Sequence, residues 1–144
     1  MLKTQTKAPD FTLKKDDGEP IRLSSLRGSK VILAFYPKDL SPVCTKQMKN
    51  YADRYDAFLE NGVHIIGVSA DDVASHAKFK SSCGLPFPLL SDPDKHVCRL
   101  YDVLSFFGTI QRTVYIIDED GIIQFAGSTM AMFYPSADEL LKLL

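Results

Sequence analysis

The sequence carries little net charge and has no long apolar run. A formal net charge of −1 gives no field that would attract nucleic acid or anionic lipid, so we expect neither as a partner. No apolar stretch approaches the ~18 residues that a membrane span needs. Residues 1–7 lack the apolar core of a signal peptide. We therefore expect a cytoplasmic protein that has no membrane partner.

Cysteine is also scarce, because the chain has three, at Cys44, Cys83 and Cys98. Their number is odd and their spacing wide, which suits neither a disulfide scaffold nor a paired zinc site. We expect these thiols to be either reactive or structural.

The histidines show no metal-binding pattern. His64, His76 and His96 have no ligand spacing and no cysteine close in sequence. We expect all three to be solvated, and we predict neither a metal nor a cofactor.

What the chain does contain is typical of one globular α/β domain. Its 144 residues, with 45% hydrophobic and 24% charged content, favour a single domain over residues 1–144. Apolar runs and periodicities predict the elements in chain order. They are a hairpin around 14–20, a strand over 31–36, a helix over 45–59, a strand over 63–69, a helix from about 73 to 82, a strand at 89–90, a short helix over 96–101, strands over 112–117 and 122–126, and a final helix over 137–144.

This order of elements indicates a mixed central sheet flanked by helices, with an N-terminal β-hairpin extension that covers an edge. It is the outline of a thioredoxin-like fold. In that fold, a redox motif lies where the first central strand meets its helix.

Cys44 occupies that position. The apolar strand over 31–36 runs into a turn bounded by Pro37 and Pro42, and a helical pattern follows. A thiol in the first turn of a helix is expected to ionise readily, because unpaired backbone N–H groups and the helix dipole stabilise the thiolate. Ser41, three residues earlier, stands where a dithiol motif has its first cysteine, so dithiol exchange is not available here.

The spacing Pro37-x-x-x-Ser41-x-x-Cys44 resembles the active-site motif of the peroxiredoxins. Other blocks resemble the bacterioferritin-comigratory, or PrxQ, branch, and they extend from Ala8-Pro9-Asp10-Phe11 through Gly84-Leu85-Pro86-Phe87-Pro88 to Ile116-Ile117-Asp118. The resemblance implies that Cys44 is the peroxidatic cysteine, which reduces hydrogen peroxide or alkyl hydroperoxides and becomes a sulfenic acid. It also implies a monomer that a thioredoxin-type thiol donor reduces.

Three further residues have a chemical role in this interpretation. The Ser41 hydroxyl can lie beside the sulfur and bind the peroxide, Pro37 can shield the site from water, and Arg112 can hold thiolate and peroxide together. Backbone N–H groups at the helix start would complete an anion site. The alternatives are a helix cap for Ser41, a strand end for Pro37 and a surface ion pair for Arg112.

The resolving step is less well defined by the sequence. Many PrxQ chains carry a resolving cysteine five residues after the peroxidatic one, where this sequence has Lys49. A second PrxQ arrangement places it in the next helix, which makes Cys83 the tentative resolving residue, with an external thiol as the alternative. Cys98 is expected to be structural. Cys44 and Cys83 would need Cα atoms about 4.4–6.8 Å apart, which can require local unwinding of a helix.

Two other functions compete with the peroxidase. A disulfide oxidoreductase is disfavoured by Ser41 and Arg112. A redox sensor or holdase that uses the same cysteine without turnover stays open. The segment over 102–111 is shorter than in many members of the family, and it belongs to the rim of the expected site.

Overall fold

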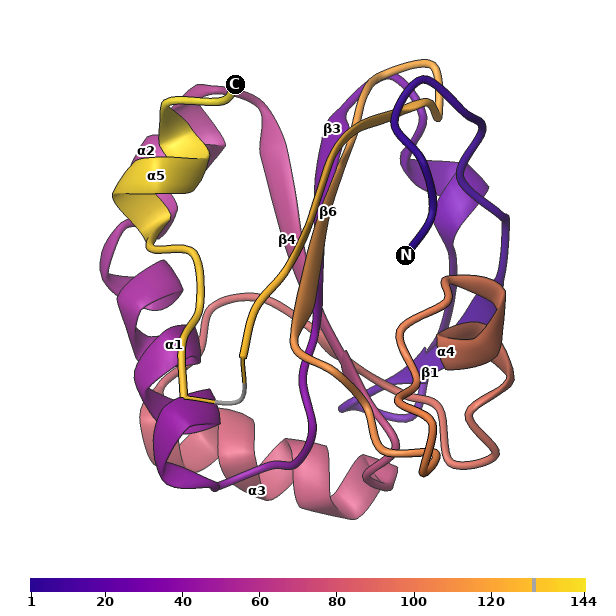
Figure 1. Ribbon diagram of the computed structural model, residues 1–144. Coiled ribbons are helices and arrows are strands. Elements are labelled where there is room, and N and C mark those ends of the chain that lie inside the picture. The colour runs from indigo at the N-terminus through magenta and orange to yellow at the C-terminus, as the bar shows by residue number, and fades with distance from the viewer. Residues whose placement is uncertain (131) are drawn as a thin grey trace.

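The structure is a computed structural model, and it describes residues 1–130 and 132–144 (Figure 1). In chain order its elements are β1 (Thr12–Lys15), β2 (Pro20–Arg22), the 3₁₀ helix η1 (Leu23–Leu26), β3 (Lys30–Phe35), α1 (Pro42–Asp53), α2 (Tyr55–Glu60), β4 (Val63–Ser69), α3 (Val73–Cys83), β5 (Leu89–Ser91), α4 (His96–Leu100), β6 (Thr113–Ile117), β7 (Ile123–Ser128) and α5 (Ala137–Leu141).

The strands within the described residues form one mixed sheet in the order β2-β1-β5-β4-β3-β6-β7. The three central strands β3, β4 and β5 are parallel, and β6 and β7 extend the sheet in antiparallel fashion. The hairpin of β1 and β2 pairs antiparallel with β5 and so covers that edge. The predicted mixed α/β sheet with its N-terminal hairpin is therefore confirmed.

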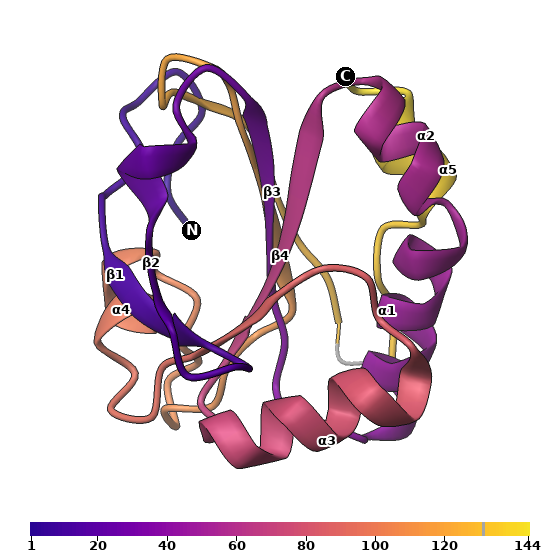
Figure 2. The same cartoon turned by 180° about the vertical axis from the view of Figure 1, so that it is seen from behind.

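Helices cover both faces of the sheet. Helices α1, α2 and α5 lie on one side of the central strands, and α4 lies on the other with the N-terminal segments (Figures 1 and 2). Side chains of β3 alternate between the two faces, as a strand requires. On the face covered by α1, Ile32, Ala34 and, directly after the strand, Tyr36 enter a first hydrophobic core. On the opposite face, Leu33 and Phe35 enter a second one. Among the described residues, no helix has the length and apolarity to cross a membrane.

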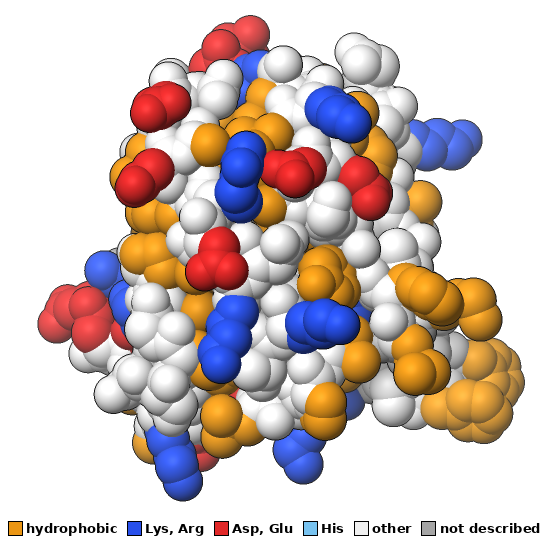
Figure 3. Space-filling model, turned by 90° about the vertical axis from the view of Figure 1, so that its left-hand side faces the viewer, with side chains coloured by type: hydrophobic (Ala, Val, Ile, Leu, Met, Phe, Trp, Pro, Cys, Tyr) orange, Lys and Arg blue, Asp and Glu red, His pale blue; other side chains and the backbone are white. Residues whose placement is uncertain are grey.

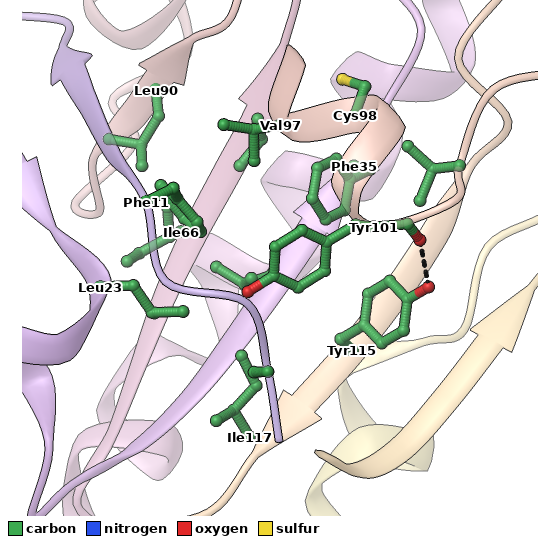
Figure 4. Packing of buried hydrophobic residues seen from close by; sticks show 14 of the residues in the cluster. Phe11, Leu23, Phe35, Ile66, Leu90, Val97, Cys98, Tyr101, Tyr115 and Ile117 are labelled. Carbon is green, nitrogen blue, oxygen red and sulfur yellow. Dashed lines mark hydrogen bonds between the residues drawn. The ribbon is translucent and has the colours of Figure 1, made fainter. Parts of the chain in front are cut away.

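The second core is rich in aromatic rings. Tyr101 packs against Phe35 and Tyr115 with ring centroids 5.4 Å apart in both pairs, and the Tyr115 hydroxyl donates to the Tyr101 carbonyl (Figure 4). Cys98 lies in the same cluster. Edge-on and tilted ring pairs stabilise such a core beyond simple area burial.

Two helix predictions need correction. The helix expected over 45–59 is divided at Arg54, which leaves helical geometry between α1 and α2, with its N–H bonded back to Tyr51. Apolar residues recur every three or four positions on both sides of Arg54, so this spacing does not reveal the break. Helix α5 ends at Leu141, three residues before the predicted end at 144, and the Ser136 side chain caps its start.

The predicted ends of α3 are confirmed. The Asp72 side chain accepts from the Ser75 N–H at 2.8 Å at the start of this helix. Gly84 ends it in the left-handed conformation, at φ +61°, where a glycine carries no steric penalty.

Gly67 is a point of close approach in the middle of β4. A Cβ atom there would stand 2.7 Å from Leu89 Cδ2 and 3.2 Å from Tyr36 Cε1. Because residue 67 has no side chain, Leu89 and the ring of Tyr36 can both pack closely against β4 at this point.

Candidate active site

Cys44 lies in the first turn of α1, as the sequence predicts. Ser41 is the N-cap residue, Pro42 opens the helix and Cys44 is the third residue of its first turn. Among the described side chains none caps this turn, so the N–H groups of Val43 and Cys44 are available at the positive end of the helix dipole. The Cys44 side chain is fully buried.

Arg112 lies directly against this thiol. It precedes β6, the antiparallel neighbour of β3, and this pairing brings it to the end of β3 from which Cys44 follows. Its Nη1 donates to Cys44 Sγ at 3.2 Å. Arg112 is only 3% exposed, so the alternative of a surface ion pair is excluded. A fixed positive charge at this distance stabilises a thiolate.

Ser41 and Pro37 flank the thiol differently from the expected arrangement. The Ser41 hydroxyl donates to the Lys38 carbonyl at 3.0 Å and makes no cap hydrogen bond, although Ser41 is the N-cap by backbone geometry. Pro37 follows directly after the buried Tyr36 and is exposed. The intervening Leu40 has φ +63°, an uncommon conformation for a residue with a branched side chain. The turn before Cys44 is thus strained locally.

Gln47 belongs to the site and was not singled out from the sequence. It lies one turn after Cys44 and is fully buried. Its Oε1 accepts from Arg112 Nη1 at 2.7 Å, and its Nε2 donates to the Tyr51 hydroxyl at 3.0 Å. The spacing of three and then four residues from Cys44 through Gln47 to Tyr51 places all three on one face of α1. That spacing, with a polar residue inside a buried stripe, is the signal that could have identified Gln47.

The expectation that His76 is solvated is wrong. Its side chain is fully buried in α3, with Nδ1 2.8 Å from Asp39 Oδ2 and Nε2 2.9 Å from the Leu90 carbonyl. The Tyr36 hydroxyl donates to the other Asp39 oxygen at 2.5 Å. Burial, and then the charge of Asp39, raises the pKa of Tyr36 well above its usual value, so the phenol stays a donor. The sequence pattern of α3 gives no sign that Asp39 is the partner of His76.

These contacts tie the turn before Cys44 to α3. Asp39 lies in that turn, and its Oδ2, which faces His76, also accepts from the Ser75 hydroxyl at 2.8 Å. Its backbone N–H donates to Asp71 at 2.8 Å. His64 and His96 are exposed, as expected.

Two groups of the described residues bring potential metal ligands together. They are Asp39 with Asp71 and His76, and Asp92 with Asp94 and His96. The spacing in sequence did not predict either group. In both groups, hydrogen bonds within the protein engage the carboxylates and ring nitrogens. The first group therefore holds the turn, and the second caps α4.

The other two cysteines lie on opposite faces of the sheet. Cys83 is the last residue of α3, is partly exposed and packs against the same core as Cys44. Cys98 is buried in the other core, where burial and then the neighbouring Asp92 raise the pKa of its thiol far above the usual range (Figure 4). The structure thus associates Cys83, and not Cys98, with the side of the sheet that carries Cys44.

Large apolar side chains are exposed in the loop before Arg112 and in the segment after β7. Phe106 and Phe107 are 98% and 88% exposed in the loop before Arg112, and Met130 and Phe133 are also exposed. The Thr129 N–H donates to the Arg112 carbonyl at 3.0 Å, which fastens the segment after β7 to the site. Figure 3 shows apolar side chains projecting at the lower right of the face that it presents.

This site defines a class of enzyme. A buried thiol at a helix start, an arginine on its sulfur and a serine in place of a second cysteine suit attack on an O–O bond and exclude dithiol exchange at this motif. The protein is a thiol-dependent peroxidase.

Comparison with known proteins agrees with this class. The model of the AhpC/TSA family matches residues 4–126. The chain is 46% identical over 124 residues to a putative peroxiredoxin bcp of Coxiella burnetii, covering 81% of this chain and 82% of that protein. It is 40% identical over 139 residues to peroxiredoxin Q, chloroplastic, of Oryza sativa subsp. japonica, covering 95% of this chain but only 64% of that protein's length.

Solved structures give the same answer. Peroxidoxin BcpB from Mycobacterium tuberculosis superposes with a TM-score of 0.90 at 31% identity, over 99% of this chain and 96% of that one. The bacterioferritin comigratory protein of Xanthomonas campestris superposes with a TM-score of 0.80 at 30% identity, over 83% and 81% of the two chains. The chain belongs to the AhpC/TSA family, and its relatives are peroxiredoxins of the bcp and Q type.

Proposed function

We propose that the protein reduces hydrogen peroxide and alkyl hydroperoxides with Cys44 as the peroxidatic nucleophile. The Cys44 thiolate attacks one peroxide oxygen, an S–O bond forms as the O–O bond breaks, and the second oxygen leaves as water or an alcohol after taking a proton. Cys44 becomes a sulfenic acid. The observation that carries this proposal is the 3.2 Å contact between Arg112 Nη1 and Cys44 Sγ.

The surrounding groups have roles in the same step. The Arg112 guanidinium stabilises the thiolate and the charge that develops on the leaving oxygen. The N–H groups of Val43 and Cys44 add donors at the helix start. Ser41 and Pro37 form the turn beside the entry to the site, with Ser41 able to bind the peroxide if its hydroxyl leaves the Lys38 carbonyl.

We further propose that Cys83 resolves the sulfenic acid. Its thiol would attack the Cys44 sulfur, water would leave, and a thioredoxin-type dithiol would reduce the disulfide. The shared core on one side of the sheet and the position of Cys83 at the end of α3 support this assignment. Reduction by an external thiol directly at Cys44 is the alternative. A monomer in the cytoplasm, where thiol donors are kept reduced, completes the proposal.

The test is peroxide consumption with dithiothreitol or thioredoxin as the electron donor. We expect continued turnover by the wild type and none by Cys44→Ser. A protein that oxidises once and then stops would instead be a redox sensor or holdase, and retained turnover in Cys44→Ser would refute the assignment of the nucleophile.

A further inference from the structure

A chain of three hydrogen bonds leads from the Arg112 guanidinium to a backbone carbonyl beyond β7. Arg112 Nη1 donates to Gln47 Oε1 at 2.7 Å, and Gln47 Nε2 donates to the Tyr51 hydroxyl at 3.0 Å. The Tyr51 hydroxyl donates to the Pro135 carbonyl at 2.7 Å. Gln47 and Tyr51 are both fully buried, so bulk water does not replace these partners.

The direction of every bond in this chain is fixed by chemistry. Arginine has only donors, so Gln47 must present its oxygen to Arg112. The amide nitrogen then faces Tyr51, whose oxygen must accept. The phenol proton is left for the Pro135 carbonyl, which can only accept. Burial raises the pKa of Tyr51 far above the usual range, so this proton is always present.

The aligned donors reinforce one another. An amide that donates through its N–H becomes a stronger acceptor at its oxygen, and this effect is larger where water is excluded. Tyr51 therefore strengthens the hydrogen bond between Gln47 and Arg112 Nη1, which is the same nitrogen that contacts Cys44 Sγ. Without the hydroxyl, Gln47 Nε2 would be buried without this acceptor, and its amide could rotate away from Arg112.

The ring of Tyr51 is itself held in place. Tyr134 packs edge-on against it, with ring centroids 6.4 Å apart and an interplanar angle of 85°. The segment that carries Tyr134 and Pro135 is also fastened to the Arg112 backbone, through the Thr129 N–H. Two residues after β7 are thus linked to Arg112: Thr129 bonds to its carbonyl, and Pro135 connects to its side chain through Tyr51 and Gln47.

We propose that Tyr51 is a positioning residue of the peroxidase reaction, which acts through Gln47 to hold Arg112 against the Cys44 sulfur. This assignment rests on the proposed function, because it concerns the geometry of the same nucleophile. Tyr51 contacts neither the thiol nor the peroxide in this role; its effect passes entirely through the Gln47 amide.

The test is the variant Tyr51→Phe, which keeps the ring and its packing and removes only the hydroxyl. We expect the second-order rate constant of Cys44 with hydrogen peroxide to fall about tenfold, equivalent to about 1.4 kcal/mol. The pH profile of Cys44 alkylation by iodoacetamide should shift to higher pH, because the thiolate loses part of its counter-charge. Tyr55→Phe is the matched control, since Tyr55 lies in α2 and packs on Phe87 away from this chain of bonds.

A double-mutant cycle separates positioning from general stability. In a Gln47→Ala background, Tyr51→Phe should change the peroxide rate less than about twofold, because the residue through which Tyr51 acts has gone. An equal loss in both backgrounds, or an unchanged rate in Tyr51→Phe alone, would overturn the assignment. If the wild type consumes no peroxide, the proposed function fails, and the alkylation profiles alone then decide: an unshifted Tyr51→Phe profile refutes the role of Tyr51.

Discussion

Cys44 and Cys98 are buried on opposite faces of the same sheet, in two separate hydrophobic cores. β3 separates them, because its successive side chains enter the two cores alternately. A disulfide between them would require the sheet itself to open. The two cysteines therefore differ in what they can do, although both side chains are buried.

Cys98 should be inert while the protein is folded. Burial and Asp92 keep its thiol protonated through neutral and mildly alkaline pH, because the pKa is raised. Alkylation of the native protein between about pH 7 and 9, followed by peptide mass spectrometry, should modify Cys44 and leave Cys98 free. Cys98→Ser should turn over peroxide like the wild type; a loss of turnover without a loss of stability would give Cys98 a role in the cycle.

Replacing Arg112 should separate its charge from its geometry. Arg112→Met removes the donor on the sulfur, and we expect the peroxide rate constant to fall about 10²- to 10³-fold, as for the loss of an oxyanion donor. Arg112→Lys keeps a charge but not the planar set of donors that serves Cys44 and Gln47 together, so it should recover only part of this loss. Stopped-flow oxidation of Cys44 measures both, and a wild-type rate in Arg112→Met would contradict the proposed site.

Removing Cys83 should trap the oxidised intermediate. After one equivalent of hydrogen peroxide, non-reducing mass spectrometry of the wild type should show a Cys44–Cys83 disulfide. Cys83→Ser should instead accumulate a sulfenic acid at Cys44, which a dimedone adduct reports, and should depend on an added small thiol. A persistent sulfenic acid in the wild type, with Cys83 and Cys98 free, would make an external thiol the resolving agent.

The buried His76 should be important for stability. His76→Leu removes the ring nitrogen that lies 2.8 Å from Asp39 Oδ2, and leaving a buried polar group short of a hydrogen bond in this way costs about 1–3 kcal/mol. Urea denaturation should show this loss in the free energy of unfolding. His64→Leu, at an exposed position of β4, is the control and should change stability by less than about 0.5 kcal/mol. Equal stability of both variants would show that the contact with Asp39 contributes little.

Much of this fold could be predicted from local sequence. The continuous apolar run before Pro37 has few alternatives to a central strand, and the Asp72 and Gly84 signals define both ends of α3. The position of Cys44 at a helix start follows from the strand and the prolines alone. Such features depend on residues that are neighbours in the chain, and the sequence shows those neighbours directly.

The missing parts of the prediction depend on distant neighbours. Gln47 and Arg112 are 65 residues apart, and no local pattern relates their side chains. His76 lies in a helix with weak amphipathic character, and only the fold supplies Asp39 and the Leu90 carbonyl as its partners. The ring of Tyr51 fits the apolar face of its helix, and nothing local in the sequence shows the partners of its hydroxyl. Polar groups inside a core are satisfied by tertiary contacts, which sequence spacing does not disclose.

Gly67 extends the reach of the active site to a strand that carries none of its chemistry. The Tyr36 ring rests against this glycine, and the Tyr36 hydroxyl holds Asp39 in the turn that leads to Cys44. A single methyl group at this position of β4 would clash with Leu89 and crowd the Tyr36 ring, and through that ring the turn. The placement of the reactive sulfur is thus set partly by the neighbouring strand β4, at a position where a hydrogen atom is the largest group that fits.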